Sequence, residues 1–174
     1  MSQTSVADQP VRAYEGKVHL SGEYPTTYLS RLASGAIYFG KAVVPYADTE
    51  LTLGEQRAKL PAAAADVPRL LGVAIADVTK EAIASTYGGY ADKDSVTIMR
   101  KGQIWVVSVD QITDLDAGVY IRHANGAAPP AGTLGSFRAT VDADYTLFAG
   151  EGLKWLAAET IGSVYFGLLE VNLP

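Results

Sequence analysis

The sequence predicts an all-β fold, a closed or sandwiched antiparallel domain preceded by an extended N-terminal arm. From Ser34 onward, short runs rich in Val, Ile, Tyr, Phe and Trp alternate with clusters of Gly, Pro and Asp, as strands and turns do. There are about eight such runs, a number typical of a barrel or a sandwich. Residues 1–13 are small and polar, with neither a helical nor a strand period, as expected of an arm.

The candidate strands share β-branched or aromatic residues and are bounded by turn-forming residues. They are Ala36–Val44, Arg69–Val78, Ser95–Arg100, Gln103–Val109, Val119–His123, Leu134–Ala139, Leu153–Ala158 and Val164–Val171. The clearest signal is SVTIMRKGQIWVVSV, in which Lys101 and Gly102 separate two apolar runs and predict a tight hairpin. Only residues 80–86, KEAIAST, favour a helix.

The chain divides into an N-terminal arm and extended segment, residues 1–33, and a β domain, residues 34–174. Gly16 and Pro25 stand among tyrosines in the first part, and such residues interrupt a long regular element. Leu29–Ala33 favours at most a single helical turn.

Two stretches of the β domain predict connections rather than strands. Pro61–Pro68 contains four consecutive alanines, but prolines at both ends favour an extended or irregular connection. Asn125–Gly132 contains two adjacent prolines and predicts an exposed loop.

Composition limits the classes of function. The chain has 174 residues, enough for one domain with some length left for an arm. Charged residues are 19% of the chain and the net charge is −5, which argues against a nucleic-acid partner. There is no cysteine, which excludes disulfides and thiolate chemistry. No apolar run approaches a membrane span, so we expect no membrane partner and synthesis in the cytoplasm.

Residues suited to catalysis are few. His19 lies in the glycine-rich N-terminal part and His123 ends a predicted strand. Neither has metal-ligand spacing around it, so a solvated or packed histidine is the better interpretation of both. No nucleophile elbow or phosphate-binding glycine loop is present. The sequence therefore predicts no enzyme, no metal and no cofactor.

Five aspartates leave two interpretations open. Asp110, Asp114 and Asp116 form one group, and Asp142 and Asp144 form another. Carboxylates at alternate positions are able to converge on a calcium ion. Aspartates at strand ends also cap turns through hydrogen bonds to the backbone. We favour turn capping because neither group completes a known calcium loop.

The aromatic residues fall into two groups. Tyr14, Tyr24 and Tyr28 lie on no regular face, so contact with another protein and packing on the parent domain are about equally good interpretations. Trp105 and Trp155 lie within strand-like runs, which predicts packing in the core or at the rim of a barrel.

The order of several segments resembles the capsid decoration, or structural cement, proteins of tailed bacteriophages. The segments are GAIYFGKAVV at 35–44, LLGVAI at 70–75, DSVTIMRKGQIWV at 94–106, DAGVYI at 116–121 and GLLEVNL at 167–173. Each is ordinary β-strand sequence, and their combination carries the resemblance. It extends from about Tyr14 to the C-terminus.

The resemblance implies a small β-barrel or jelly-roll-like sandwich that binds the outer surface of the phage head. The implied partners are the major capsid protein and neighbouring copies of the same chain, as a dimer or trimer. We expect capsid or subunit contacts at the N-terminal arm, through Val11, Arg12, Tyr14, Tyr24 and Tyr28. The alternative is a receptor- or glycan-binding β-sandwich of a phage tail or adhesin, which would need an exposed Trp or Tyr near the acidic turns.

Overall fold

The computed structural model describes residues 15–19, 25–46, 56–77, 88–124 and 134–174. Within these ranges the fold is all-β, as predicted, with one short 3-10 helix, η1 (Ala64–Arg69). The strands are β1 (Thr27–Ala33), β2 (Ile37–Tyr38), β3 (Ala42–Pro45), β4 (Arg57–Lys59), β5 (Gly72–Ala74), β6 (Gly89–Tyr90), β7 (Ser95–Ser108), β8 (Tyr120–Arg122), β9 (Phe137–Arg138), β10 (Thr146–Phe148), β11 (Leu153–Ile161) and β12 (Val164–Asn172).

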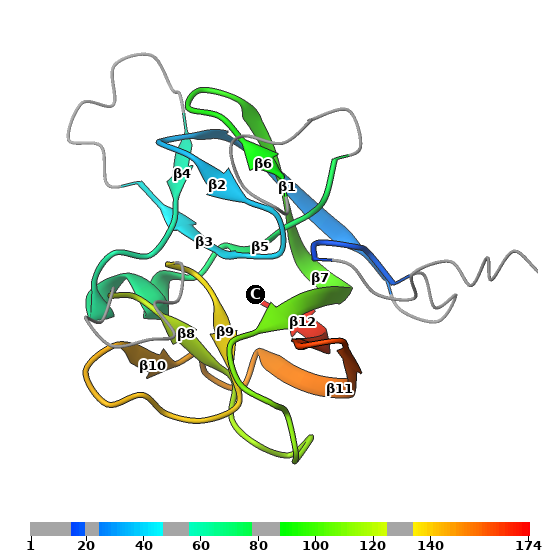
Figure 1. Cartoon of the computed structure of the whole chain (residues 1–174). Helices are drawn as coiled ribbons and strands as arrows, with labels where there is room; N and C mark the ends of the chain where they lie inside the picture. Colours follow the sequence, from blue (N-terminus) through cyan, green and yellow to red (C-terminus); the bar gives the residue numbers. More distant parts are fainter. Residues whose placement is uncertain (1–14, 20–24, 47–55, 78–87, 125–133) are drawn as a thin grey trace, which may run out of the picture.

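Five strands close a small barrel in the upper half of Figure 1. The strands follow one another in the order β1, β4, β3, β5 and β7, and β7 pairs with β1 to complete the ring. All of these pairings are antiparallel except that of β1 with β4. The short ribbon of β2 and β6 lies beside the barrel, joined by the pairing of Ile37 with Tyr90. Closure leaves these central strands few free edges.

Strand β7 is long enough to belong to both the barrel and a second sheet. Its first half pairs with β1 and β5, and its second half, from Lys101 to Ser108, pairs with β12. The second sheet runs in the order β11, β12, β7, β9, β8 and β10, below the barrel in Figure 1. The two halves of the molecule are therefore joined through one continuous strand.

The predicted hairpin at Lys101 and Gly102 is wrong. Both residues lie inside β7, which continues without a turn. Gly102 has a φ of 134°, a conformation that favours glycine, at the point where β7 leaves its pairing with β1. The glycine therefore marks an irregularity in a long strand. The strands that pair with β7 on its two edges come from distant parts of the sequence.

Three other predictions need correction. Leu29–Ala33 is part of β1 and not a helical turn, so the end of the predicted N-terminal segment belongs to the barrel. Ala36–Val44 is divided into β2 and β3 by a turn at Gly40. The connection Pro61–Pro68 contains most of η1, where the Asp66 carboxylate accepts hydrogen bonds from Ala62 N (2.9 Å) and Lys59 Nζ (3.0 Å). The predicted helix at 80–86 and the predicted loop at 125–132 lie outside the described residues.

The described residues form three clusters of buried apolar side chains. The barrel core includes Ile37, Val43, Tyr90 and Ile98, and Tyr90 meets Phe39 edge to face with ring centroids 5.3 Å apart. The largest cluster joins barrel strands to the second sheet; among its members are Val73, Met99, Ile104, Phe137, Trp155 and Leu169. A third, small cluster consists of Trp105, Phe166 and Leu168. Among the described residues no helix is long and apolar enough to cross a membrane.

Candidate functional site

Residues 15–19 lie along the second half of β7, on the edge opposite β12. Gly16 N donates to Trp105 O (2.8 Å), and Trp105 N donates to Lys17 O (2.8 Å). Val18 forms an antiparallel bridge with Ile104, and His19 N donates to Gln103 O (2.8 Å). This short segment is thus added to the sheet as an extra edge, immediately after residues 1–14.

A buried ion pair attaches the start of this segment to the barrel. Lys41 Nζ donates to Glu15 Oε1, and both side chains are almost completely buried. Burial raises the pKa of Glu15 above its ordinary value, against the opposing effects of the charge and hydrogen bond of Lys41. Glu15 Oε2 has no hydrogen-bond partner. Removing one member of such a pair leaves an uncompensated buried charge, which is strongly unfavourable.

Beside this ion pair, two glycines allow the backbone of the N-terminal segment to approach the turn between β2 and β3. Gly16 has a φ of 80° and Gly40 a φ of 67°, both in the left-handed region that favours glycine. A Cβ on Gly40 would lie 2.3 Å from Glu15 Cγ and 2.9 Å from Gly16 N. Gly40 N also donates to Ala74 O, and Ala76 N donates to Gly16 O, each at 2.8 Å. We call Glu15, Gly16, Gly40 and Lys41 the N-terminal anchor.

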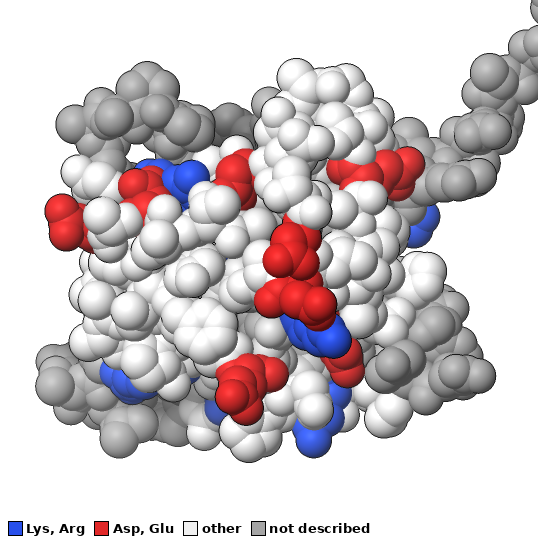
Figure 2. Space-filling view, turned by 90° about the horizontal axis from the view of Figure 1, so that it is seen from below, with Lys and Arg blue, Asp and Glu red and all other residues white. Residues whose placement is uncertain are grey.

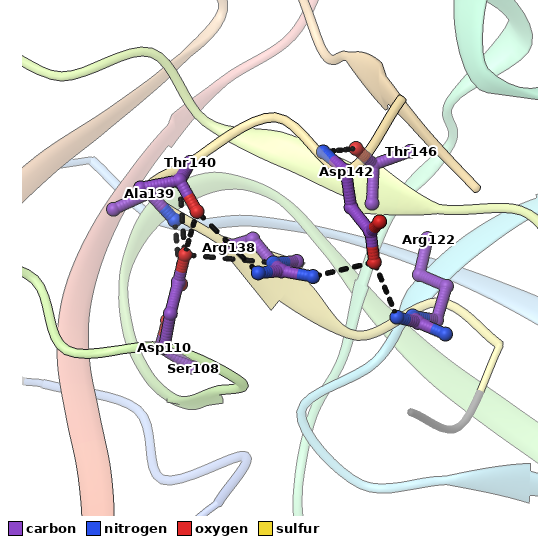
Figure 3. Close-up of polar contacts among 8 residues, drawn as sticks. All are labelled: Ser108, Asp110, Arg122, Arg138, Ala139, Thr140, Asp142 and Thr146. Atoms are coloured by element: carbon purple, nitrogen blue, oxygen red, sulfur yellow. Dashed lines mark hydrogen bonds and ion pairs between the residues drawn. The ribbon is translucent and has the colours of Figure 1, made fainter. Parts of the chain in front are cut away.

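A second polar cluster joins two loops at the other end of the second sheet (Figure 3). Asp110, just beyond β7, accepts hydrogen bonds from Ser108 Oγ (3.0 Å), Ala139 N (3.0 Å), Thr140 N (3.1 Å) and the Thr140 hydroxyl. Burial acts to raise the pKa of Asp110, but hydrogen bonds from Thr140, Ala139 and Ser108 and the charge of Arg138 hold it below its ordinary value.

Arg138 connects Asp110 to Asp142, and Arg122 binds Asp142 as well. Arg138 Nε is 3.4 Å from Asp110 Oδ2, and Arg138 Nη1 donates to Asp142 Oδ2 at 2.6 Å. The same oxygen of Asp142 accepts from Arg122 Nη2 at 2.8 Å, as Figure 3 shows. Arg122 is only 1% exposed, and its Nε and Nη1 have no hydrogen-bond partner. We call Asp110, Arg122, Arg138 and Asp142 the loop brace.

The structure confirms turn capping for Asp114, whereas Asp110 joins two distant loops and Asp142 forms ion pairs with two arginines. Asp110 receives the backbone N–H groups of residues 139 and 140, and Asp114 Oδ1 accepts from Asp116 N at 2.9 Å. Within the described ranges, no group of three or more His, Asp or Glu side chains is arranged to hold a metal ion. These contacts satisfy backbone donors at strand ends, which is a structural role.

Of the predicted contact residues, the structure describes only Tyr28. It lies in β1 opposite Met99 and is 45% exposed. Val11, Arg12, Tyr14 and Tyr24 lie outside the described residues. The structure therefore brings Tyr28 to the barrel surface and gives no geometry for the other four.

Other sequence predictions can be compared with the structure directly. Trp105 is 9% exposed and Trp155 1% exposed, which agrees with the prediction that both pack in the core or at the rim of a barrel. His19 is exposed and His123 is buried, in agreement with one solvated and one packed histidine.

Sequence reasoning missed the residues that form the N-terminal anchor and the two arginines of the loop brace. Glu15 and Lys41 are separated by 26 positions, and no local pattern joins them. The one available signal was the pair of charged residues next to glycines, Glu15-Gly16 and Gly40-Lys41. A glycine beside a charge permits a close backbone approach without predicting which segment approaches.

Charged residues make up 19% of the chain. On the face seen in Figure 2, charged side chains form small groups separated by broad uncharged areas. Large apolar side chains that are exposed include those of Tyr46, Leu115, Val141, Phe148 and Ile161. Such surfaces suit contact with other proteins, because uncharged groups lose less hydration when they are covered.

Comparison with known proteins identifies the family. Residues 2–164 match the family described as "Structural cement protein (E217 gp24/Pam3 gp6)". No curated protein sequence matches significantly. The match extends over the barrel and over the second sheet as far as β11, and ends at Val164, the first residue of β12. The match contains four of the five segments that carry the resemblance, all except GLLEVNL at 167–173. The chain belongs to this family of phage structural cement proteins.

Proposed function

We propose that this protein binds the outer surface of a phage capsid and clamps neighbouring major capsid proteins together, stabilising the shell against the pressure of packaged DNA. Membership of a structural cement family supports association with the capsid. The N-terminal anchor is the observation that supports clamping, because it attaches the chain that follows residue 14 to both the barrel and β7. No catalytic step is required for this function.

In this proposal residues 1–14 grip the capsid and the anchor transmits the load. A force that pulls on residue 14 meets first a buried ion pair and then the hydrogen bonds of residues 16–19 to β7. Antiparallel hydrogen bonds and a buried pair resist separation as a unit. A moderate binding free energy at each copy adds up to a large stabilisation when the contact is repeated over a whole shell.

Removing residues 2–13 tests the role of the arm. The deletion leaves Glu15, the anchor and β1 intact, so we expect unchanged thermal unfolding of the domain. We expect a large loss of occupancy when the variant and the full chain are co-sedimented with capsids that lack the cement protein. Full occupancy by the variant would refute the proposed arm.

Tyr28 allows a finer test with a matched control. Tyr28 and Tyr46 are 45% and 41% exposed, and replacing either with Ser removes a similar apolar area. We propose that Tyr28 contacts the capsid or a neighbouring copy, so Tyr28→Ser weakens capsid binding more than Tyr46→Ser does. Equal binding of the two variants would remove Tyr28 from the proposed contact surface.

The glycan-binding alternative has less support. It needs an exposed Trp or Tyr near the acidic turns, but both tryptophans are buried. Tyr145, beside Asp144, is partly covered and its ring lies 5.9 Å from the guanidinium carbon of Arg122.

A further inference from the structure

Strand β11 presents a long free edge. It has nine residues, pairs with β12 on one side, and ends the second sheet. No backbone hydrogen bond of the described residues is made to its outer edge. An edge of this length is a template on which another strand is able to pair.

The sequence of β11 is self-complementary in one register. A bulge lies between Trp155 and Ala157, so residues 155 and 156 together occupy one position along the strand. On this count, a two-fold axis through Ala157 aligns two copies of β11 in antiparallel orientation. Ala157 then faces Ala157 of the second copy, and Lys154 faces Glu159. A register centred on Glu159 would place like charges opposite each other, which is unfavourable.

The two charges are able to meet because they lie on the same face of the sheet. Lys154 is opposite Glu170 and Glu159 is opposite Phe166 on β12. Residues 166 and 170 are four apart, so they project to one side. Lys154 is exposed and Glu159 partly exposed, and neither forms an ion pair with another described residue.

We propose that two copies of this chain pair through β11 about a two-fold axis at Ala157, which extends the second sheet across the dimer. A lysine on an edge strand ordinarily deters pairing, but in this register each Lys154 meets a Glu159, giving two symmetric pairs. The inference goes beyond the proposed function and names a surface for the contact between copies that the resemblance to cement proteins implies. It concerns the protein in solution and needs no capsid.

Charge reversal tests the register. We expect the full chain to show a monomer–dimer equilibrium in sedimentation velocity. Lys154→Glu alone and Glu159→Lys alone each replace two attractive pairs with two repulsive ones, and we expect each to raise the dimer dissociation constant about tenfold. The double variant restores the opposite charges and returns the constant toward that of the unmodified chain.

A cysteine on the axis gives an independent test, because the natural chain contains no cysteine. Directly opposite residues in an antiparallel pair have Cα atoms about 4.5–5.5 Å apart, within the range of a disulfide. Ala157→Cys is therefore expected to form a covalent dimer under mild oxidation. Thr160→Cys, three positions from the axis, would have its two sulfur-bearing residues about 20 Å apart and stays monomeric on a non-reducing gel.

The outcomes separate this inference from the capsid-binding proposal. A full chain that remains monomeric at all concentrations, or equal cross-linking at 157 and 160, would overturn the β11 pairing even if capsid binding is intact. Loss of capsid binding with dimerisation retained would count only against the proposed clamp. Thermal unfolding of each variant, followed by tryptophan fluorescence, verifies that the strand pair is folded.

Discussion

The N-terminal anchor and the loop brace hold carboxylates in opposite ways. Glu15 is buried with a single cationic partner and keeps one oxygen without a hydrogen bond. Asp110 accepts hydrogen bonds from Ser108, Ala139 and Thr140 and lies near Arg138. Burial consequently dominates the pKa of Glu15 and raises it, whereas the donors around Asp110 lower its pKa.

Both the depth of burial and the number of donors differ between the two carboxylates, because Glu15 is almost completely buried with one donor and Asp110 is partly buried with several. One ion pair does not replace the hydration that Glu15 loses, while several hydrogen bonds do so for Asp110. The anchor is therefore the region more easily disrupted, although it joins the proposed arm to the domain. The loop brace is the more tolerant of the two.

The largest expected effect is that of removing the cation of the anchor. Lys41→Met leaves Glu15 buried without a partner, and we expect about 3–5 kcal/mol to be lost from the attachment of residues 15–19. Hydrogen exchange at the amide of Trp105, which donates to Lys17 O, reports this detachment. Lys59→Met is the control, because the pair of Lys59 with Asp66 is partly exposed and should contribute about 1 kcal/mol or less. Equal increases in hydrogen exchange in the two variants would contradict the expectation that the buried ion pair contributes more than the partly exposed one.

The next effect concerns the close approach at Gly40. Gly40→Ala introduces a Cβ that collides with Glu15 and Gly16, whereas Gly35 has a similar positive φ but nothing within 4 Å of an added Cβ. We expect Gly40→Ala to lower the free energy of unfolding by about 1–3 kcal/mol more than Gly35→Ala does. Urea unfolding of both variants measures the difference, and equal losses would show that φ alone matters.

A smaller effect is expected in the loop brace. In Asp110→Asn the amide nitrogen is unable to accept the hydrogen bonds of Thr140 or Arg138, and we expect a loss of about 1–3 kcal/mol in the free energy of unfolding. Asp144→Asn, at an exposed position in the same region, serves as the control and should change stability little. A similar loss in both variants would argue against the brace.

The smallest effects are the pH dependences, and their signs differ. The pKa of Asp110 is lowered, so its stabilising contribution is complete above the ordinary value of 3.8 and disappears as the pH falls through the folded-state pKa. The pKa of Glu15 is raised, so its contribution weakens as the pH rises from the ordinary value of 4.5 through the folded-state pKa.

Two variants isolate these signs in urea titrations at several pH values. Relative to the natural chain, Asp110→Asn should be most destabilising at neutral pH and nearly equivalent in strong acid. Glu15→Gln should improve relative to the natural chain as the pH rises above 4.5. Parallel stability curves for the natural chain and either variant would contradict the corresponding shift.

Prediction from sequence was most successful for strands whose pattern is local. The predicted strands at Val119–His123, Leu153–Ala158 and Val164–Val171 correspond to β8, β11 and β12, because each segment shows an apolar run with β-branched or aromatic residues next to turn residues. The hairpin at Lys101 and Gly102 failed because a glycine within a long strand and a glycine in a turn give the same local signal. Only the partners on the two edges of β7 distinguish them.

The candidate site was less accessible to sequence reasoning. Capping by Asp114 followed from its place in a turn, since an aspartate caps a turn through short-range hydrogen bonds. The donors that Asp110 binds at Ala139 and Thr140 are about 30 positions away in the sequence. The Glu15–Lys41 pair and the burial of Arg122 depend on which strands become neighbours. The proposed contact residues Val11, Arg12, Tyr14, Tyr24 and Tyr28 remain predictions.

The sequence by itself determined the all-β class, the low surface charge and the absence of thiol chemistry, because these depend on composition and short periods. Only the tertiary structure decided that β1 closes the barrel against β7, that β7 serves two sheets, and that Glu15 is buried against Lys41. Pairing joins residues as distant as Ser30 and Ser95, whose hydroxyls lie 2.9 Å apart. Contacts over such separations arise when the whole chain packs, and no local stretch of sequence specifies them.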